Sequence, residues 1–390
     1  EKAKDKVYHD VGRLKKKFRE RKKPILIVTG CVAQAEGDEM LKRENYIDAV
    51  VGPQSYHEIP NIIKSVGIKK GKINKTEFEV IEKFDKLNLI KNKSTKISAF
   101  LTIQEGCDKF CHFCVVPYTR GPEHSRSFDE IVLEAKQLVD NGAKEITLLG
   151  QNVNAYNFKA KRLSDLIYKL SGINRLIRIK YTTSHPKDMT EDLIKAHEEC
   201  KKLMPILHLP VQSGSSKILK LMNRKHNVEE YLSILRKLKE KKPNIQFSSD
   251  FIIGYPGETE SDFNNTLTLM KDVKFINSYS FVYSARPGTP AANLETVDRK
   301  KSKDRLKIFQ ETADIIKKDY RKNILNTKVN VLFENRLDGN KYFGRDEYSN
   351  SVVVENKNNI VGNILNVKIT KFNYNTLFGE VINNEKDVAA

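Results

Sequence analysis

Three closely spaced cysteines are the residues best suited to carry chemistry. Cys107, Cys111 and Cys114 form the pattern C-x3-C-x2-C, and three thiols this close cannot all pair as disulfides. A structural zinc ion would need a fourth ligand, but His112 is adjacent to Cys111 and poorly placed, and Cys200 is remote in sequence. A 4Fe–4S cluster held by three cysteines leaves one iron open for a small molecule. We therefore favour a cluster over zinc.

Strands and helices alternate on either side of this motif and downstream of it, and they would position it. From residue 96 to about residue 323, apolar runs predict six strands and five intervening helices. The predicted strands are Ile97–Ile103, Glu145–Leu149, Leu176–Tyr181, Met204–Leu209, Ile245–Ile253 and Ser278–Tyr283. The predicted helices are Phe128–Asn141, Leu163–Leu170, Glu191–Lys201, Glu229–Lys241 and Glu260–Val273. The pattern predicts an α/β fold with an open, partial (β/α)6 barrel.

Five of the predicted strands end in polar or Gly/Pro-rich loops. These loops read GCDKFCHFC, LGQNVNAY, TTSHP, LPVQSGS and GYPGET. Because the carboxyl ends of strands in a parallel barrel carry the active site, we expect the functional residues there.

The two ends of the chain have different patterns. Residues 1–23 predict a basic amphipathic helix, followed by strands at Pro24–Thr29 and Ile47–Val51 and a helix at about Ala35–Arg43, as in part of an open parallel sheet. After residue 325, short alternating strands punctuated by glycine predict a small antiparallel barrel. The predicted barrel strands are Val329–Phe333, Ser351–Glu355, Asn366–Lys371 and Phe378–Ile382.

Composition limits the class of protein. With 390 residues we expect two to three domains, and no apolar run approaches the ~18 residues of a membrane-spanning helix. The net charge of +19 favours a polyanionic partner. This charge is concentrated in residues 1–100 and 201–250, away from the cysteine motif.

The motifs together resemble one family. The segments are QEGCDKFCHFCVVPYTRG (104–121), LLGQNVNAY (148–156), TSHP (183–186), HLPVQSGS (208–215), MNRKH (222–226), SSDFIIGYPGET (248–259) and YSARPGTPA (283–291). They resemble, in order, the MiaB-type tRNA methylthiotransferases, a family of radical S-adenosylmethionine (radical SAM) enzymes. The resemblance implies a partial flavodoxin-like methylthiotransferase N-terminal domain (1–66), a linker (67–92), a radical SAM core (93–323) and a C-terminal TRAM domain (324–383).

By this resemblance, Cys107, Cys111 and Cys114 hold a 4Fe–4S cluster whose open iron binds SAM, and the radical comes from SAM rather than from a protein side chain. Residues at the strand ends are expected to contact SAM: Gln151, Asn152, Ser184, Gln212, Ser213, Asp250, Gly254 and Gly257. Arg120 and Arg126 are candidates for contacts with RNA phosphate, or else they are solvated loop residues. His185 and His208 are either structural or catalytic.

Members of the family hold a second, auxiliary 4Fe–4S cluster with three N-terminal cysteines, of which Cys31 matches the third. The other two ligands are expected before Glu1, so that the chain corresponds to an N-terminally truncated protein. We expect such a chain to cleave SAM but to insert sulfur poorly. Cys200 has no counterpart in the family pattern, and we interpret it as a structural residue.

The loops GQNVNAY and YTTSHP resemble those of enzymes that act on N6-isopentenyladenosine at tRNA position 37, next to the anticodon. The expected reaction is methylthiolation at C2 of that base. Alternatives are a methylthiotransferase for threonylcarbamoyladenosine or for a ribosomal protein, and a truncated, non-catalytic, cluster-containing RNA-binding protein. We expect a cytoplasmic monomer with no membrane partner, which uses a sulfur donor and an electron donor such as ferredoxin or flavodoxin.

Overall fold

The structure is a computed structural model that describes residues 2–68, 71–76 and 96–382. The chain divides into two compact units, and each is described by itself. Unit 1 contains Glu1–Asn92, Glu105–His124 and Ser284–Asn293, and unit 2 contains Lys93–Gln104, Ser125–Tyr283 and Leu294–Ala390. Among the described residues, no helix combines the length and the apolar character needed to cross a membrane.

Unit 1 is built on a three-stranded parallel sheet in the order β1-β2-β3. Its strands are β1 (Ile27–Thr29), β2 (Ala49–Val51) and β3 (Ile73–Lys75). Its helices are α1 (Lys2–Lys17), α2 (Cys31–Glu36), α3 (Asp38–Arg43), η1 (Pro53–Glu58), α4 (Ile59–Ile68), α6 (Val116–Arg120) and η4 (Pro290–Asn293). The apolar side chains of Val11, Met40 and Ile47 pack around the buried strand residue Val50, so the basic first helix covers the sheet with its apolar stripe.

Two local predictions for unit 1 need correction. The helix expected at Ala35–Arg43 is two helices, because Gly37 between them adopts φ +48° and breaks the backbone ladder. Strand β3 lies in the segment for which a linker was expected, and it pairs with β2. Residues 67–68 of that segment end helix α4, and residues 69–70 and 77–92 fall outside the described residues.

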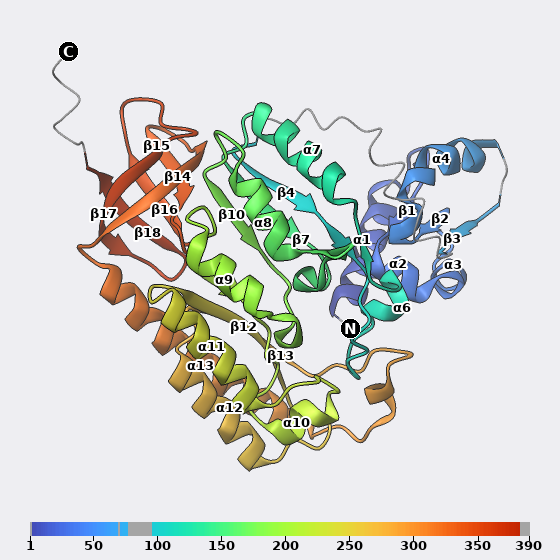
Figure 1. Ribbon diagram of the computed structural model, residues 1–390. Helices are drawn as coiled ribbons and strands as arrows, with labels where there is room; N and C mark the ends of the chain where they lie inside the picture. The colour runs from blue at the N-terminus through green and yellow to red at the C-terminus, as the bar shows by residue number, and fades with distance from the viewer. Residues whose placement is uncertain (1, 69–70, 77–95, 383–390) are drawn as a thin grey trace. The chain divides into compact units, whose positions relative to one another are not determined.

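Unit 2 contains the predicted partial barrel. Strands β4 (Ser98–Thr102), β7 (Glu145–Leu149) and β10 (Arg178–Tyr181) form one parallel sheet, and β11 (Ile206–His208), β12 (Gln246–Ile253) and β13 (Asn277–Val282) form another. A parallel bridge between Ile179 and Leu203 joins them. The six strands therefore follow one another in chain order, which confirms the predicted architecture (Figure 1).

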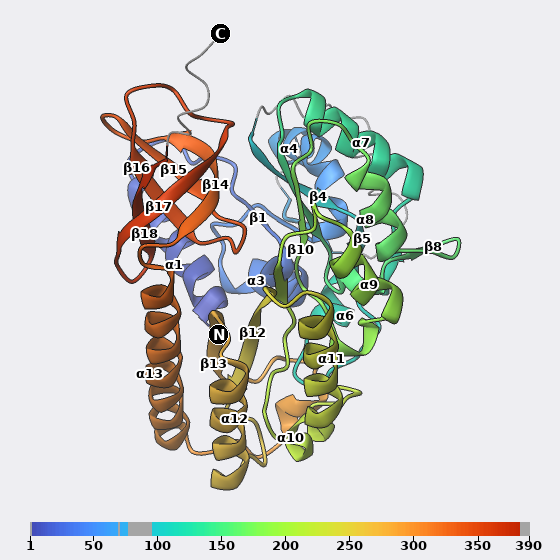
Figure 2. The same ribbon diagram turned by 60° about the vertical axis from the view of Figure 1, so that its left-hand side comes forward.

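Helices cover one side of these strands. They are α7 (Phe128–Asp140), α8 (Leu163–Ser171), α9 (Glu191–Glu199), α11 (Val228–Lys241) and α12 (Glu260–Val273), close to the predicted ranges (Figures 1 and 2). Short elements are β5 (Gln104–Glu105), β6 (His124–Ser125), η2 (Val153–Ala155), β8 (Asn157–Phe158), β9 (Lys161–Arg162), η3 (Pro186–Asp188) and α10 (Ser216–Leu221). Alternate strand residues such as Leu101, Ile146, Leu207 and Phe251 point into the core beneath the helices. The residues between them form the opposite, inner face.

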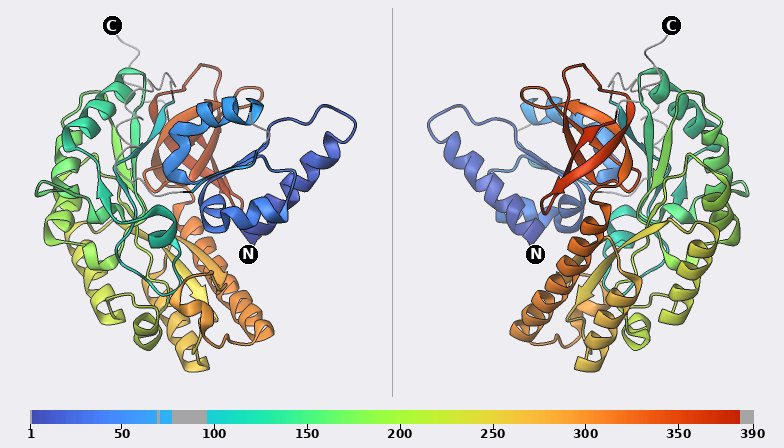
Figure 3. Two further views of the ribbon diagram at one scale, coloured as in Figure 1. Left: turned by 90° about the vertical axis from the view of Figure 1, so that its right-hand side faces the viewer. Right: turned by 90° about the vertical axis from the view of Figure 1, so that its left-hand side faces the viewer.

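A long helix that the sequence analysis did not predict, α13 (Arg299–Ile324), follows β13. Near its beginning, the buried Arg305 donates to Glu258 (Nη1–Oε1, 2.8 Å). Near its end, the Tyr320 hydroxyl accepts a hydrogen bond from Asn350 (3.3 Å). The helix therefore belongs both to the partial barrel and to the C-terminal strands that follow it (Figure 3).

The C-terminal strands form a closed barrel in the order β14-β15-β16-β18-β17. They are β14 (Lys328–Arg336), β15 (Lys341–Arg345), β16 (Ser351–Glu355), β17 (Ile364–Phe372) and β18 (Thr376–Val381). Strand β15 was missed in the sequence analysis. Phe333 and Tyr342 are buried in the barrel core, whereas Tyr374 is 61% exposed.

One buried arginine ties this barrel to the sheet. The Arg178 guanidinium donates to the backbone carbonyls of Arg345 (2.8 Å) and Asn330 (2.7 Å). On the same strand, Lys180 contacts the Ser349 hydroxyl at 3.3 Å. Because Arg178 is only 6% exposed, its donors depend on these carbonyls, and the C-terminal barrel is anchored on β10.

Candidate functional site

The loop that carries the three cysteines is held in shape at its neck. The backbone N–H of Cys107 donates to the Gly121 carbonyl at 3.1 Å, and that of Cys114 donates to the Cys111 carbonyl at 2.9 Å. Gly106, just before the loop, adopts φ +75°, and a Cβ there would lie 1.8 Å from the Pro122 carbonyl oxygen. Only glycine fits this position.

A reciprocal pair closes the same loop. The backbone N–H of Asp108 donates to the Glu123 carboxylate (3.4 Å), and the backbone N–H of Glu123 donates to the Asp108 carboxylate (3.2 Å). Between these ends, Phe110 adopts φ +48° and its ring contacts Tyr118 edge-on, with centroids 6.3 Å apart. These contacts hold the loop in a defined conformation.

The three cysteines of this loop form no disulfide, and their thiols are partly withdrawn from water. Cys111 is buried, and Cys107 and Cys114 are partly exposed. Burial raises the pKa of Cys107 to about 12, and the charges of Glu123, Cys114 and Cys111 add to this shift. A proton therefore stays on the sulfur until a cation takes its place. Within the described ranges no three His, Cys, Asp or Glu side chains form a site for one metal ion; an iron–sulfur cluster does not need this, because each thiolate binds a different iron.

Cys31, at the start of α2, lies within reach of an arginine that follows the cysteine motif. The Nε of Arg120 donates to the Cys31 sulfur at 3.3 Å, and its Nη1 donates to the buried Glu105 carboxylate at 2.8 Å. Gln54 donates to the Arg120 backbone carbonyl at 2.8 Å. Burial would lower the pKa of Arg120, but Cys31 and Glu105 outweigh it and raise that pKa. Arg120 is thus a fixed cation beside the sulfur.

Arg126, the other arginine considered for RNA phosphate, is engaged inside unit 2. Its side chain is 5% exposed, pairs with Glu134 at 2.8 Å and donates to the Thr102 carbonyl at 2.7 Å. A structural role therefore fits Arg126 better than contact with RNA.

The predicted SAM contacts all lie in unit 2, at or near the ends of strands. After β7, the side-chain oxygen of Gln104 accepts the backbone N–H groups of Gln151 (3.0 Å) and Asn152 (3.1 Å). The Asn152 amide donates to Asp188 at 2.8 Å. These bonds fix the turn in which Gln151 and Asn152 stand.

The loop after β10 contains a strained residue and a buried hydroxyl. Thr183 adopts φ +68°, which is rare for a β-branched residue, and its carbonyl accepts the Val153 N–H at 2.9 Å. The Ser184 hydroxyl is buried, and within the described part of the chain it has no hydrogen-bond partner. Such an atom suits a polar ligand. His185 is buried and caps its own turn by accepting the Lys187 N–H at 3.1 Å, which supports the structural interpretation.

The loop after β11 is held by a carboxylate from helix α12. Ser213 accepts the Ser215 N–H at 3.2 Å, and the Ser215 hydroxyl donates to Asp262 at 2.6 Å. Gln212 adopts φ +79° and bridges to Phe251 of β12. Asp262, at the beginning of α12, therefore fixes the loop that carries Gln212 and Ser213.

The two glycines after β12 are explained by packing within the protein. A Cβ at Gly254 would lie 2.3 Å from the Ser302 hydroxyl of α13, and one at Gly257 would lie 3.3 Å from Leu221. The Gly254 N–H donates to Glu258 at 3.0 Å. Close approach of α13 thus accounts for Gly254, and adenine contact at either glycine stays a prediction.

Family comparisons agree with this arrangement of parts. Residues 1–52 match the uncharacterized protein family UPF0004, residues 101–270 the Radical SAM superfamily and residues 325–382 the TRAM domain. The whole chain aligns with the tRNA-2-methylthio-N(6)-dimethylallyladenosine synthase of Pelagibacter ubique (strain HTCC1062) at 59% identity over 397 residues, which is 89% of that protein. The chain belongs to this synthase family.

Other relatives extend the comparison. The synthase of the same name from Ruegeria sp. (strain TM1040) is 46% identical over 98% of this chain and 88% of its own length. Among solved structures, the apo form of the cobalamin-dependent S-adenosylmethionine radical enzyme OxsB aligns with a TM-score of 0.51 and 14% identity, over 80% of this chain. This chain spans only 48% of the OxsB chain. That likeness concerns the fold alone.

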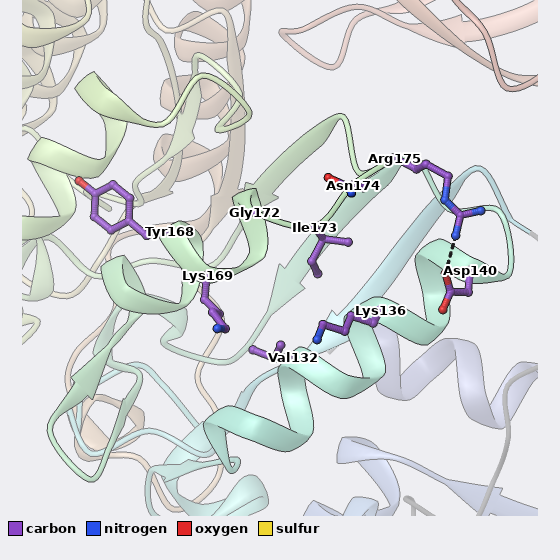
Figure 4. Close-up of a pocket in the computed structure, with 9 residues that line it drawn as sticks. All are labelled: Val132, Lys136, Asp140, Tyr168, Lys169, Gly172, Ile173, Asn174 and Arg175. Atoms are coloured by element: carbon purple, nitrogen blue, oxygen red, sulfur yellow. Dashed lines mark hydrogen bonds and ion pairs between the residues drawn. The ribbon is translucent and has the colours of Figure 1, made fainter.

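A pocket in this member of the synthase family lies away from all the predicted site residues. It has a volume of about 540 Å³ between α7 and α8 and is lined by Lys136, Asp140, Lys169 and Arg175, among others. Figure 4 shows the ion pair between Arg175 and Asp140 at its rim (2.5 Å). The pocket is on the helical side of the sheet, whereas family chemistry is expected at the strand ends.

Two supporting residues, Arg305 and Asp262, were missed from sequence, and each fixes a loop that carries predicted site residues. Arg120 was named only as a candidate for RNA phosphate, and its contact with Cys31 was missed. The pattern Thr259-x-x-Asp262 is a capping box that could have marked the beginning of α12. No local pattern marks Arg120, since its partner Cys31 is far away in sequence. Cys200, interpreted as structural, is buried in the main apolar core.

Proposed function

We propose that this protein is a tRNA-2-methylthio-N6-dimethylallyladenosine synthase, which adds a methylthio group to C2 of N6-isopentenyladenosine at tRNA position 37. The observation that carries this proposal is the 59% identity over the whole chain to a synthase of that name. The cysteine loop supports it, because its three thiols suit a cluster with one open iron.

In this proposal Cys107, Cys111 and Cys114 hold a 4Fe–4S cluster and SAM binds beside it. Together these groups supply the one-electron chemistry that activates the C2–H bond of adenine. The chain itself supplies orientation and exclusion of water. Gln104 holds the turn of Gln151 and Asn152.

Other residues proposed to contact SAM belong to unit 2. Ser184 offers a buried hydroxyl, and Gln212 and Ser213 stand in the loop fixed by Asp262. Asp250, Gly254 and Gly257 remain candidates on β12 and the loop after it. No protein side chain is assigned as a catalytic residue.

Cys31 is proposed as a ligand of the auxiliary 4Fe–4S cluster. Arg120 supports this role, because its guanidinium donates a hydrogen bond to the Cys31 sulfur and holds a positive charge beside it. Hydrogen bonds to the sulfurs also help to set a cluster's reduction potential. Arg120 is accordingly a positioning residue.

The remaining parts of the proposal concern organisation and partners. We propose a methylthiotransferase N-terminal domain in 1–66, a linker in the part of 67–92 outside strand β3, a radical SAM core in 93–323 and a TRAM domain in 324–383. The TRAM barrel and the net charge of +19 fit tRNA as the polyanion. A cytoplasmic monomer would receive electrons from a donor such as ferredoxin or flavodoxin, and sulfur from a separate donor.

Mass spectrometry of tRNA nucleosides tests the proposal. A bacterial strain without its own synthase is complemented with the full-length form of this protein, or with the same form carrying Cys111→Ala. We expect 2-methylthio-N6-isopentenyladenosine with the first and only N6-isopentenyladenosine with the second. The 2-methylthio form of threonylcarbamoyladenosine, or a methylthiolated ribosomal protein, would overturn the substrate assignment. Failure of the reconstituted protein to form 5′-deoxyadenosine would favour the non-catalytic RNA-binding alternative.

A further inference from the structure

Two large aromatic side chains stand exposed on the inner face of strand β13. Tyr279 is 56% exposed and Phe281 is 60% exposed. Exposed aromatic clusters are unfavourable in water, and where they occur they commonly mark a binding surface. Neither residue belongs to the cysteine loop or to the predicted SAM contacts.

The strand pairing fixes which way these rings point. Phe247, Phe251 and Ile253 of β12 lie in the core beneath the helices, so the residues between them face the other way. Tyr279 pairs in register with Asp250, and Phe281 pairs with Ile252. The two rings therefore share the inner face with Asp250 and Ile252.

A third strand adds a polar group to this face. His208 on β11 contacts the Ser248 hydroxyl through Nδ1 at 2.9 Å, and its Nε2 lies 3.5 Å from Oδ1 of Asp250. The imidazole ring meets Tyr279 edge-on, with centroids 6.1 Å apart. We call His208, Asp250, Tyr279 and Phe281 the inner-face cluster. It combines two aromatic surfaces with a donor and a carboxylate in one place.

The chemistry of this cluster matches an adenine that carries an apolar branch. Aromatic side chains bind unpaired bases by stacking, and an apolar ring also suits the five-carbon isopentenyl group. A carboxylate accepts the N6–H of such a base, and an imidazole can donate to a ring nitrogen. A phosphate would instead require arginine or lysine at this place.

The position of the inner-face cluster also fits the binding of the substrate base. Phe281 pairs with Ile252, which precedes Gly254 by two residues, or about 7 Å along the strand. A base on the inner face would therefore lie next to the strand ends where the proposed SAM contacts stand. A site on the helical side would be separated from them by the sheet.

We propose that the inner-face cluster binds the N6-isopentenyl-adenine of the substrate tRNA, with Tyr279 and Phe281 as the apolar wall and His208 with Asp250, which this assigns to the base instead of to SAM, at the polar edge of the base. This inference deepens the proposed function and rests on it. Tyr279 and Phe281 are thereby specificity-determining residues, which distinguish an isopentenylated adenosine from an unmodified one.

A binding experiment tests this without any turnover. The full chain is titrated into two fluorescent anticodon stem-loops that differ only in whether the adenosine at position 37 carries the isopentenyl group. We expect the wild-type protein to bind the isopentenylated probe at least about tenfold more tightly. Tyr279→Ala and Phe281→Ala should each weaken binding of that probe by about 5- to 100-fold, and the double variant should bring the ratio of the two dissociation constants close to one.

Two further variants sharpen the result. Phe281→Leu keeps an apolar side chain without a ring, so it should retain part of the preference. Tyr168→Ala removes a partly exposed tyrosine from the helical side (38% exposed) and should leave both dissociation constants unchanged. Because Tyr279 and Phe281 are exposed, the variants should keep the wild-type melting temperature, which circular dichroism checks.

The possible failures are distinguishable. If wild type makes the methylthio product in cells but Tyr279→Ala and Phe281→Ala bind both probes as wild type does, the inner-face assignment is overturned and the proposed function stands. An equal loss for both probes would also overturn it, since the cluster would then be a general RNA contact. If the full-length form makes no product in cells, the proposed function itself fails.

Discussion

Asp262 should be one of the most sensitive positions in unit 2, although no predicted cofactor contact lies there. Its carboxylate accepts hydrogen bonds from the Ser215 hydroxyl (2.6 Å), the Thr259 hydroxyl (2.6 Å) and the Thr259 backbone N–H (2.9 Å), and it pairs with Lys217 at 3.0 Å. The residue is 6% exposed. Asp262→Ala removes all of these partners at once.

The expected loss of stability for Asp262→Ala follows from these hydrogen bonds and this ion pair. A hydrogen bond to a charged group contributes about 1.5–3 kcal/mol, whereas the pair with the half-exposed Lys217 adds less than about 1 kcal/mol. Because bonds to one carboxylate are not additive, we expect Asp262→Ala to lower the free energy of unfolding by about 3–5 kcal/mol. Asp165 has the same N3 position in α8 but is exposed and accepts only the Arg162 N–H. Asp165→Ala should cost only about 0.5–1 kcal/mol.

Urea unfolding followed by far-UV circular dichroism measures both values through the shift in midpoint. Hydrogen exchange of the peptide that contains Ser213 and Ser215 should locate the loss, because the loop is released when its anchor is removed. A cost below about 1 kcal/mol for Asp262→Ala, or equal costs at Asp262 and Asp165, would refute the reasoning.

The same carboxylate gives a pH dependence with a definite sign. Burial would raise the pKa of Asp262, but the hydrogen bonds from Ser215 and Thr259 and the charge of Lys217 lower it far below its usual range. Its stabilisation is therefore complete above the unfolded-state pKa of about 3.9 and is lost as pH falls through the lower folded-state pKa. The difference between wild type and Asp262→Asn should be constant near neutral pH and shrink under acid conditions.

Three other perturbations have definite expected outcomes. Gly106→Ala should abolish iron binding after anaerobic reconstitution, because its Cβ would collide with backbone, whereas Gly142→Ala, with φ +106° but open space, should keep normal iron content. Arg178→Ala should raise proteolysis and hydrogen exchange in the C-terminal barrel, and Arg175→Ala, whose side chain is 60% exposed, should not. Burial raises the pKa of Asp346 to about 6, so its contribution favours folding at low pH and is lost as pH rises from about 4 through 6; Asp346→Asn should remove this part of the pH dependence of the melting temperature.

The barrel strands were predictable because each is an apolar run bounded by a polar turn. Strand β12, for example, was expected at Ile245–Ile253 and runs from Gln246 to Ile253. Helix α13 was missed because its buried side includes Ser302, Arg305 and Arg321, so it lacks the continuous apolar stripe that marks a helix. Tertiary ion pairs and hydrogen bonds replace that stripe, and sequence periodicity does not register them.

The site also contains some residues that a local sequence pattern marks and others that only the packing of the fold brings together. The cysteine spacing is local, so it could be recognised from sequence. The contact of Arg120 with Cys31 joins residues 89 positions apart, and that of Ser215 with Asp262 joins residues 47 apart. Such contacts depend on how the elements pack. The inner-face cluster was partly predictable. The alternation of residues along β13 can be read from sequence, but which of its two faces is exposed depends on its pairing with β12.

Helix α13 limits which sequence changes this protein can accept. Its 26 residues span about 39 Å, with Arg305 bound to Glu258 near one end and Arg321 bound to the Asn373 carbonyl near the other. Inserting or deleting one residue between these anchors would turn everything downstream by about 100°. Substitutions along the exposed surface should be tolerated, but single-residue changes in length should not. Diversity in this segment is therefore expected in composition and not in residue number.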